Sequence, residues 1–433
     1  MKNWYVLYSN ILHLHFSDGF YKLPESAKNA VSPTSLVKRL LKVLGYSLVR
    51  LVGNLFKSVE QPGKLKGKVW LYVVSQNNYD SLKFIQEGIP DAVFVAGQSK
   101  EIGKYNAIVN RLSLRKKVLY YYKFLPLYFQ FLKHKKESTL RFYDVLFDAI
   151  GFYEVYLQKL RKYKPATIVF ANDHNPDARA MLLAAKAAGI NTAYIQHASV
   201  SPIFPPLQFD LNLLEGQDAL VKYKLCGPVE GKVELVGMPK ADAYANYRNT
   251  SQQIGTIGIG CNLMDDLGEI TRLLRQLTID FPSINFILRP HPRDKRDFKT
   301  LSTISSNISI SDPRTEPTFD YLNRIDVQLS GNSGIHLEAV LLNVWSIFYN
   351  MNSTESLHDY YGFIAHGLAD AATNYSELRD LLQSSLNQKP EVYLRAKYYN
   401  ATVGTEHDGK SSELALKYLK EFVQTSQPAK AKL

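Results

Sequence analysis

The sequence is poor in cysteine and has no long uninterrupted apolar run. Only Cys226 and Cys261 stand among 433 residues, too few for a disulfide framework and without the spacing of a zinc site. No run reaches the roughly 18 apolar residues of a membrane-spanning helix. The first twenty residues contain Asn, Ser and two His and lack a small-residue cleavage site, so no signal peptide is expected. We therefore expect a cytoplasmic protein, with peripheral contact at the inner face of the cell membrane.

Acidic residues are outnumbered by basic ones. The chain has 52 Lys and Arg against 40 Asp and Glu, a net charge of +12, which favours an anionic partner such as nucleic acid, anionic lipid or a phosphorylated substrate. Because no zinc finger, aromatic RNA-binding motif or helix-turn-helix pattern is present, we expect no nucleic-acid partner. The hydrophobic share of 45% is enough for real cores, and the length predicts two domains.

Two basic stretches carry apolar residues at helical spacing. Residues 34–59 include Lys38, Arg39, Lys42 and Arg50, and an aromatic run near 120–132 lies between further basic clusters. Such helices can lie on an anionic bilayer, which makes the membrane a candidate partner. The alternative is a helix packed on the protein with its basic face in solvent.

From residue 67 onward, short apolar runs alternate with helical patterns. Strands are predicted at 68–75, 91–97, 166–173, 191–199, 209–216 and 232–239, with a helical region over 103–162. After a polar stretch at 240–253, which we expect to be the linker between the domains, the alternation restarts, with strands at 255–262, 284–292, 307–313, 326–334 and 344–350. This pattern predicts an α/β fold with two doubly wound Rossmann-like domains facing a cleft. The predicted segments are an N-terminal helical part (1–66), two domains (67–245 and 246–405) and a C-terminal helix and tail (406–433) that can cross back to the first domain.

Polar and titratable residues follow the predicted strands in both halves, where open α/β sheets bind ligands. Asp173 and His174 follow one strand, and His197 follows the next. An aspartate or an imidazole at such a position can serve as a general base, and an imidazole titrates near neutral pH. For Asp173 the alternative is a carboxylate that caps the helix beginning near residue 176. His174 has the alternative of simple exposure.

In the second half, an apolar strand ends in Arg289-Pro290-His291-Pro292-Arg293. The two prolines stiffen this loop and restrict the position of the imidazole.

A later strand ends in Ser330-Gly331-Asn332-Ser333-Gly334, which opens a helix containing Glu338. Serine hydroxyls and the first N–H groups of a helix can bind a phosphate. The alternative is an ordinary N-cap. We predict that this turn and His291 meet at one edge of the sheet and hold one anion.

These two motifs, and the Tyr194-Ile195-Gln196-His197-Ala198-Ser199 stretch, resemble elements of bacterial GT-B-type glycosyltransferases. The most similar groups are those of capsule and lipopolysaccharide synthesis: sialyltransferases, Kdo transferases and CDP-glycerol glycerophosphotransferases. They share an Arg/Lys-x-His-Pro element, a serine-containing phosphate loop and a Gln-His-Gly element, where this chain has Ala198 in place of the glycine. The resemblance covers about 166–350.

The resemblance implies a GT-B-type glycosyltransferase that transfers a sugar from a nucleotide donor, CMP-linked as one option, to a glycan or glycolipid acceptor at the cell surface. Asp173, or else His197, would be the base. His291 would assist the leaving nucleotide as an acid or charged donor. The remaining donor contacts would come from Arg289, Arg293, Ser330, Asn332, Ser333, Gly334 and Glu338.

Other functions remain open. They are a teichoic-acid-type transferase using a CDP-polyol with His197 as base, a UDP-sugar 2-epimerase-like enzyme, and a non-catalytic glycan- or lipid-binding module. We predict no metal and no cofactor beyond the nucleotide sugar, since the only acidic pair near a strand end, Asp265-Asp266, suits a helix cap.

Overall fold

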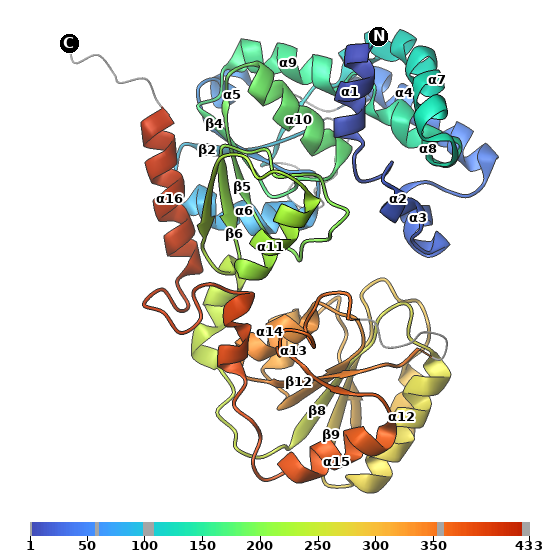
Figure 1. Ribbon diagram of the computed structural model, residues 1–433, viewed down its shortest axis with the longest axis vertical. Coiled ribbons are helices and arrows are strands. Elements are labelled where there is room, and N and C mark those ends of the chain that lie inside the picture. The colour runs from blue at the N-terminus through green and yellow to red at the C-terminus, as the bar shows by residue number, and fades with distance from the viewer. Residues whose placement is uncertain (1, 57–59, 98–107, 353–358, 427–433) are drawn as a thin grey trace. The chain divides into compact units, whose positions relative to one another are not determined.

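The computed structural model describes residues 2–56, 60–97, 108–352 and 359–426 (Figure 1). It contains two compact units. The first comprises Met1–Leu235 and Ser412–Leu433, and the second comprises Val236–Ser411. In the described part of the chain, no helix has both the length and the apolar character needed to cross a bilayer.

The first unit is built on a parallel sheet with the order β3-β2-β1-β4-β5-β6-β7 in the described residues. This is the doubly wound order, and it reverses direction between β1 and β4. The strands are β1 (Val69–Tyr72), β2 (Ala92–Gly97), β3 (Asn110–Leu112), β4 (Thr167–Phe170), β5 (Asn191–Ile195), β6 (Leu211–Leu214) and β7 (Lys232–Leu235).

Helices cover both faces of this sheet, and the helices of the N-terminal part add to its apolar core. Tyr8 and Ile11 of α1, and Leu12 directly after it, belong to the same apolar core as Trp70 of β1, so residues 1–66 are not a separate segment. The helices are α1 (Lys2–Ile11), α2 (Asp18–Tyr21), α3 (Glu25–Val31), α4 (Leu36–Phe56), α5 (Pro62–Leu65), α6 (Gln76–Gly88), the 3₁₀ helix η2 (Arg115–Lys123), α7 (Phe124–His134), α8 (Lys136–Ala149), α9 (Phe152–Tyr163), α10 (Pro176–Ala187) and α11 (Gln217–Cys226).

The second unit repeats the doubly wound order. Its parallel sheet runs β10-β9-β8-β11-β12-β13 in the described residues, with the reversal between β8 and β11. The predicted fold class, α/β with two doubly wound domains, is confirmed. The strands are β8 (Thr256–Gly260), β9 (Asn285–Arg289), β10 (Ile308–Ile310), β11 (Val327–Ser330), β12 (Trp345–Tyr349) and β13 (Asp370–Ala372). The helices are η3 (Pro239–Tyr247), α12 (Leu267–Asp280), η4 (Lys299–Thr303), α13 (Thr318–Leu322), α14 (Ile335–Leu341), α15 (Tyr375–Ser385) and η5 (Tyr393–Tyr398).

The unit boundaries differ from the predicted segments. The stretch 240–253 is not a free linker, because Tyr244 stacks on Phe319 at 4.6 Å and Asn249 N donates to Leu342 O at 2.7 Å within the second unit. The predicted boundary between 245 and 246 therefore lies inside that unit. The last helix, α16 (Ser411–Ser426), returns to the first unit, where Leu416 lies against Gly88.

One short strand lies where only helix was predicted. Residues 103–162 were expected to be helical, and 103–107 lie outside the described residues, but β3 occupies Asn110–Leu112. Its strand conformation comes from pairing with β2, which places Asn110 opposite Val95. A three-residue edge strand has no periodicity of its own from which a sequence could predict it.

Candidate functional site

The carboxyl ends of β9, β8 and β11 lie side by side in the second unit, at the reversal of strand order. Two pockets open at this edge, and His291 lines both. The Glu338 pocket, of about 320 Å³, is lined by Gly260, Cys261, Arg289, Pro290, His291, Pro292, Pro313, Pro317, Thr318, Ser333, Gly334, Ile335 and Glu338. The Asp265 pocket, of about 280 Å³, is lined by Asn262, Leu263, Met264, Asp265, His291, Gly331, Asn332, Asn350 and Asn352. The proline-flanked imidazole and the serine-glycine turn thus line common cavities.

The His291 ring is held as a neutral imidazole. Its Nδ1 accepts a hydrogen bond from the backbone N–H of Arg293 at 3.1 Å, which a protonated Nδ1 could not do. Burial, followed by the nearby charge of Arg293, lowers the pKa of His291 below its usual value. The remaining proton therefore sits on Nε2, and this atom is the hydrogen-bond donor of the ring. His291 was expected to act as an acid or as a charged hydrogen-bond donor. In this structure its ring is placed as a neutral donor instead.

Arg289 lines the Glu338 pocket but is tied into the protein. Its guanidinium donates to Ser311 Oγ at 2.6 Å and to Glu316 O at 2.9 Å, and it lies over the Tyr321 ring. Arg293 is exposed, is absent from the lining of both pockets, and contributes to the loop through its backbone. Arg289 is therefore the one of the two predicted arginines that the structure places at the pocket.

The serine-glycine turn divides its residues among three positions. Ser330 is buried and its hydroxyl donates to Gly260 O at 2.7 Å, which joins β11 to β8 and leaves Ser330 out of both pocket linings. Asn332 lines the Asp265 pocket, and its Oδ1 accepts from Tyr360 N at 3.2 Å. Ser333 and Gly334 line the Glu338 pocket. The prediction that Ser330 contacts the donor is therefore not supported by its position.

Glu338 lies one turn into α14 and faces the pocket named after it. Its Oε1 is 2.6 Å from Lys240 Nζ of η3, so the carboxylate is oriented by an ion pair. A carboxylate in this position can accept hydrogen bonds from hydroxyl groups of a ligand.

Asp265 and Asp266 have different roles, and the sequence predicted only the helix cap, which Asp266 forms. Asp266 caps α12, accepting from Gly268 N at 2.7 Å and Glu269 N at 3.1 Å. Asp265 instead accepts from Asn262 N at 2.7 Å and lines its pocket beside His291. Burial raises the pKa of Asp265 to about 6. Its place in the short loop between β8 and α12, at the carboxyl end of a strand, was the signal that could have identified it.

His336 is a second residue that the sequence analysis missed. It is buried, its Nε2 lies 2.8 Å from Gly331 O, and its Nδ1 lies 2.6 Å from Ser346 Oγ. Burial lowers the pKa of His336 to about 4, so the neutral ring donates to Gly331 and accepts from Ser346. It thereby fixes the turn between the two pockets to β12.

In the first unit, Asp173 and His174 form a pair after β4, next to the reversal of strand order. Asp173 Oδ1 lies 2.8 Å from His174 Nδ1, and Tyr223 OH donates to Oδ2 at 2.6 Å. Burial alone would raise the pKa of Asp173, but the hydrogen bonds from His174 and Tyr223 bring it below its usual value. At 2% exposure, with both oxygens engaged, Asp173 is not placed to take a proton from a ligand.

His174 is oriented by this carboxylate. Its side chain is 29% exposed and stacks on Phe204 with ring centroids 4.4 Å apart. Because Nδ1 faces the carboxylate, Nε2 is the nitrogen left to accept a proton, as in catalytic Asp–His pairs. Simple exposure was the alternative for His174, and the contacts with Asp173 and Phe204 show that the ring is held in place instead.

His197 follows β5 in the same unit and is half-buried. Asn78 Nδ2 lies 3.3 Å from His197 Nε2 and 3.4 Å from Ala171 O, while Asn78 Oδ1 accepts from Val74 N at 3.2 Å. Asn78 thus connects the ends of β1, β4 and β5. His197 Nε2 is engaged in this network, which makes it a weaker base candidate than His174.

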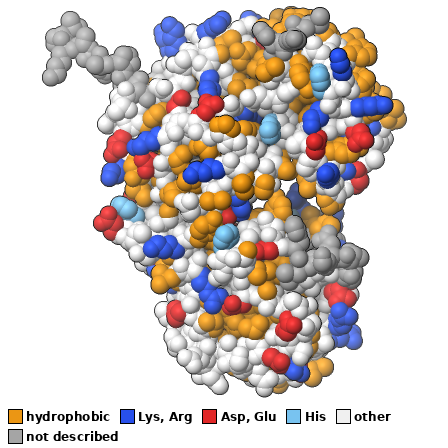
Figure 2. Space-filling model, in the orientation of Figure 1, with side chains coloured by type: hydrophobic (Ala, Val, Ile, Leu, Met, Phe, Trp, Pro, Cys, Tyr) orange, Lys and Arg blue, Asp and Glu red, His pale blue; other side chains and the backbone are white. Residues whose placement is uncertain are grey.

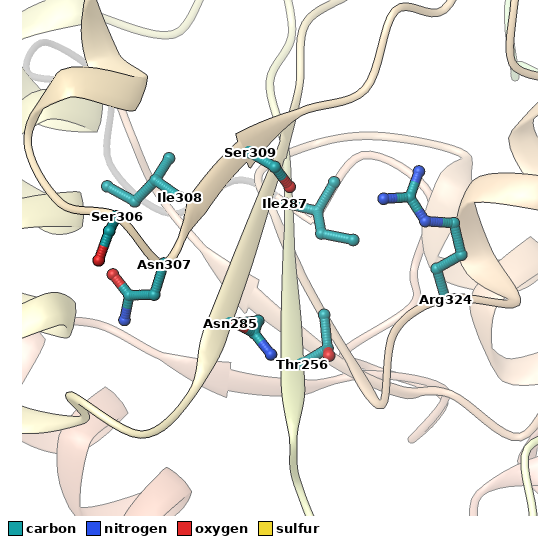
Figure 3. A pocket seen from close by; sticks show the side chains of 8 residues that line it. All are labelled: Thr256, Asn285, Ile287, Ser306, Asn307, Ile308, Ser309 and Arg324. Atoms are coloured by element: carbon teal, nitrogen blue, oxygen red, sulfur yellow. The ribbon is translucent and has the colours of Figure 1, made fainter.

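A third pocket lies at the opposite ends of the strands in the second unit (Figure 3). Thr256 and Asn285 are the first residues of β8 and β9, and Arg324, the one charged residue of the lining, pairs with Glu316 at 2.8 Å. This pocket carries no acid–base pair comparable to the two at the carboxyl edge. Within the described ranges, no cluster of three or more His, Cys, Asp and Glu is arranged to hold a metal ion.

Comparison with known proteins identifies the architecture. No family model matches the sequence, and no curated protein matches it. Among solved structures, a UDP-GlcNAc 2-epimerase from Neisseria meningitidis bound to UDP-GlcNAc superposes with a TM-score of 0.53 at 11% identity, covering 82% of this chain and 100% of that one. The calicheamicin glycosyltransferase CalG4 gives a TM-score of 0.51 at 9% identity, covering 83% and 100%. The chain has the GT-B fold. At these identities the likeness concerns the fold alone.

Proposed function

We propose that the chain is a metal-independent glycosyltransferase that moves a sugar from a nucleotide-sugar donor to a cell-surface glycan at the cytoplasmic face of the membrane. A CMP-linked acidic sugar is the first candidate donor, and capsule polysaccharide or lipopolysaccharide is the first candidate acceptor. The observation that carries the proposal is the Glu338 pocket, which collects Arg289, His291, Ser333 and Glu338 at the reversal of a doubly wound sheet. Ligands bind such sheets at this place.

The pocket supplies three kinds of contact that a nucleotide needs. The hydroxyl of Ser333 and Nε2–H of His291 can donate to phosphate oxygens, the positive charge of Arg289 lowers the free energy of the bound anion, and Glu338 can accept from ribose. As the bond between the anomeric carbon and the phosphate oxygen breaks, the electron pair stays on the phosphate. Donors already in place stabilise this growing charge.

We assign the removal of the acceptor proton to His174, with Asp173 as its positioning residue. His174 Nε2 takes the proton of the acceptor hydroxyl while that oxygen forms its bond to the anomeric carbon. The carboxylate of Asp173 then faces an imidazolium and stabilises it, which is the role of the aspartate in Asp–His pairs.

The proposal is tested first by binding and then by turnover. In a thermal-shift series with CMP, CDP, UDP, GDP and ADP, we expect at least one nucleotide to raise the melting temperature. A ligand at 100 times its Kd adds about 2.7 kcal/mol to the free energy of unfolding. If none raises it, the nucleotide site is disproved.

The protein is then incubated with a sugar donor that carries the nucleotide found to bind, with and without a glycan acceptor. Release of nucleotide that depends on the acceptor supports a transferase. Conversion of a UDP-sugar to its 2-epimer without acceptor would replace the proposal with an epimerase. Release of CMP from a CDP-polyol would replace it with a glycerophosphotransferase.

A further inference from the structure

Helix α4 is amphipathic, and its charged face is turned toward the protein. Lys42 Nζ lies 2.9 Å from Asp144 of α8, and Arg50 Nη2 lies 2.9 Å from Asp148 of the same helix. Arg39 donates to the carbonyl of Leu140 at 2.7 Å. The alternative considered from the sequence, a packed helix with its basic face in solvent, is therefore wrong for these three residues.

The face of α4 that points outward is apolar. Val37, Leu40, Leu44, Leu48 and Leu51 recur every three or four residues and so form one stripe. Leu44 is 66% exposed and Leu48 is 63% exposed. A helix of an isolated soluble protein normally has the opposite orientation, with its apolar stripe against the core.

The neighbouring segment η2–α7 extends this surface. α4 packs against η2, which continues directly into α7. Leu119, Tyr122, Leu125 and Phe129 are each more than half exposed and are again spaced by three or four residues. In Figure 2, hydrophobic side chains are exposed in the upper right part of the first unit, where Figure 1 places α7. We call the outward residues of both segments the α4–α7 face. Contiguous exposed apolar surface of this kind marks an interaction site.

The two chain segments that form this face carry charged side chains of one sign only. Residues 26–59 and 102–136 contain no Asp or Glu. Lys38, Arg115, Lys116 and Lys133 are exposed, and none of them forms an ion pair within the described part of the chain. The apolar stripe is thus bordered by basic side chains whose charge is not compensated by the protein.

We infer that the α4–α7 face docks in the plane of an anionic lipid bilayer, with its leucine and aromatic side chains below the headgroups and the basic residues at the phosphates. An apolar stripe bordered by lysine and arginine is the composition that binds such interfaces. A second copy of the chain is a poorer occupant, since two faces of equal positive charge would repel. The α4–α7 face shares no residue with either pocket, and the inference does not depend on the proposed function.

The test is sedimentation of the full chain with vesicles of phosphatidylcholine alone and of phosphatidylcholine with 30% phosphatidylglycerol. We expect binding to the anionic vesicles that weakens with added salt. L44Q/L48Q/F129Q should weaken it by about tenfold or more, because these side chains no longer enter the apolar layer. K38E/K116E/K133E should abolish the preference for anionic lipid. The matched control is I279Q/L394Q, which changes two equally exposed apolar residues of the second unit and should bind as the wild type does.

Melting temperatures near that of the wild type establish that the variants fold, since the changed side chains are exposed. The inference is overturned if the wild type does not bind anionic vesicles, or if L44Q/L48Q/F129Q binds them as tightly as the wild type does. It is also overturned if the free chain dimerises and these substitutions abolish the dimer without vesicle binding, which would make a second copy the occupant. Nucleotide binding is measured in parallel and should be the same in all variants, so this result stands apart from the test of the proposed function.

Discussion

Nδ1 of His174 lies 2.8 Å from Oδ1 of Asp173, so the two consecutive residues form one acid–base unit. The carboxylate is buried and the imidazole is partly exposed. A pair arranged in this way can move a proton at the ring and keep its negative charge on the aspartate.

The Asp173–His174 pair predicts a loss of turnover without loss of donor binding. We expect D173N and H174Q each to reduce kcat by about 100-fold or more, because the amide no longer holds the tautomer and the glutamine has no basic nitrogen. The double variant should be little worse than either single one, since the two residues act as a unit. Nucleotide affinity measured by calorimetry should be unchanged. H197Q is the control, and a larger effect from it than from H174Q would transfer the role of base to His197.

At His291, two amide substitutions separate the functions of the ring nitrogens. H291N can still accept the bond from Arg293 N at the Nδ1 position but has no donor at the Nε2 position. H291Q places an amide nitrogen near Nε2. We expect H291N to weaken nucleotide binding by about 10- to 100-fold, the usual effect of losing a hydrogen bond to a charged group, and H291Q to weaken it less. Equal losses in the two variants would contradict donation by Nε2.

Ser330 and Ser333 belong to the same turn but should respond differently to replacement by alanine. S330A removes the bond to Gly260 O and should lower the free energy of unfolding by about 1 kcal/mol, with nucleotide affinity retained. S333A removes a hydroxyl from the Glu338 pocket and should weaken nucleotide binding with little change in stability. Chemical denaturation and calorimetry on both variants measure the two effects. The reverse outcome would show that the donor occupies another place.

Asp265 predicts a pH-dependent stability. Its folded-state pKa is raised from 3.8 to about 6, so the folded protein holds this proton more tightly than the unfolded chain does. The resulting stabilisation is fully present below pH 4 and is lost as the pH rises through 6. D265N carries no charge to bury. Its free energy of unfolding relative to the wild type should therefore rise between pH 4 and pH 7, by about 3 kcal/mol at most. Denaturant unfolding at both values measures this difference, and an equal difference at the two would show that Asp265 has an ordinary pKa.

The fold followed from local patterns that the chain carries in itself. Apolar runs alternating with helical spacing predicted both doubly wound sheets, because strand and helix periods are set by neighbouring residues. The prolines around His291 and the glycines after Ser330 likewise predicted loops at strand ends. Since parallel strands place their carboxyl ends at one edge, the meeting of His291 with Ser333 could be expected from the order of strands and loops along the chain.

What each side chain does at that edge was decided only by tertiary contacts. Nothing in the sequence around Asp173 and His174 indicates that the aspartate is buried and the histidine partly exposed. Nor does the sequence indicate which of the hydroxyls of Ser330 and Ser333 faces a pocket. The apolar stripe of α4 faces outward because Lys42 and Arg50, on its other face, pair with Asp144 and Asp148. These aspartates lie about a hundred residues away in the chain. The protonation state, burial and hydrogen-bond partners of these side chains depend on groups that are distant in sequence. A local sequence pattern therefore does not predict them.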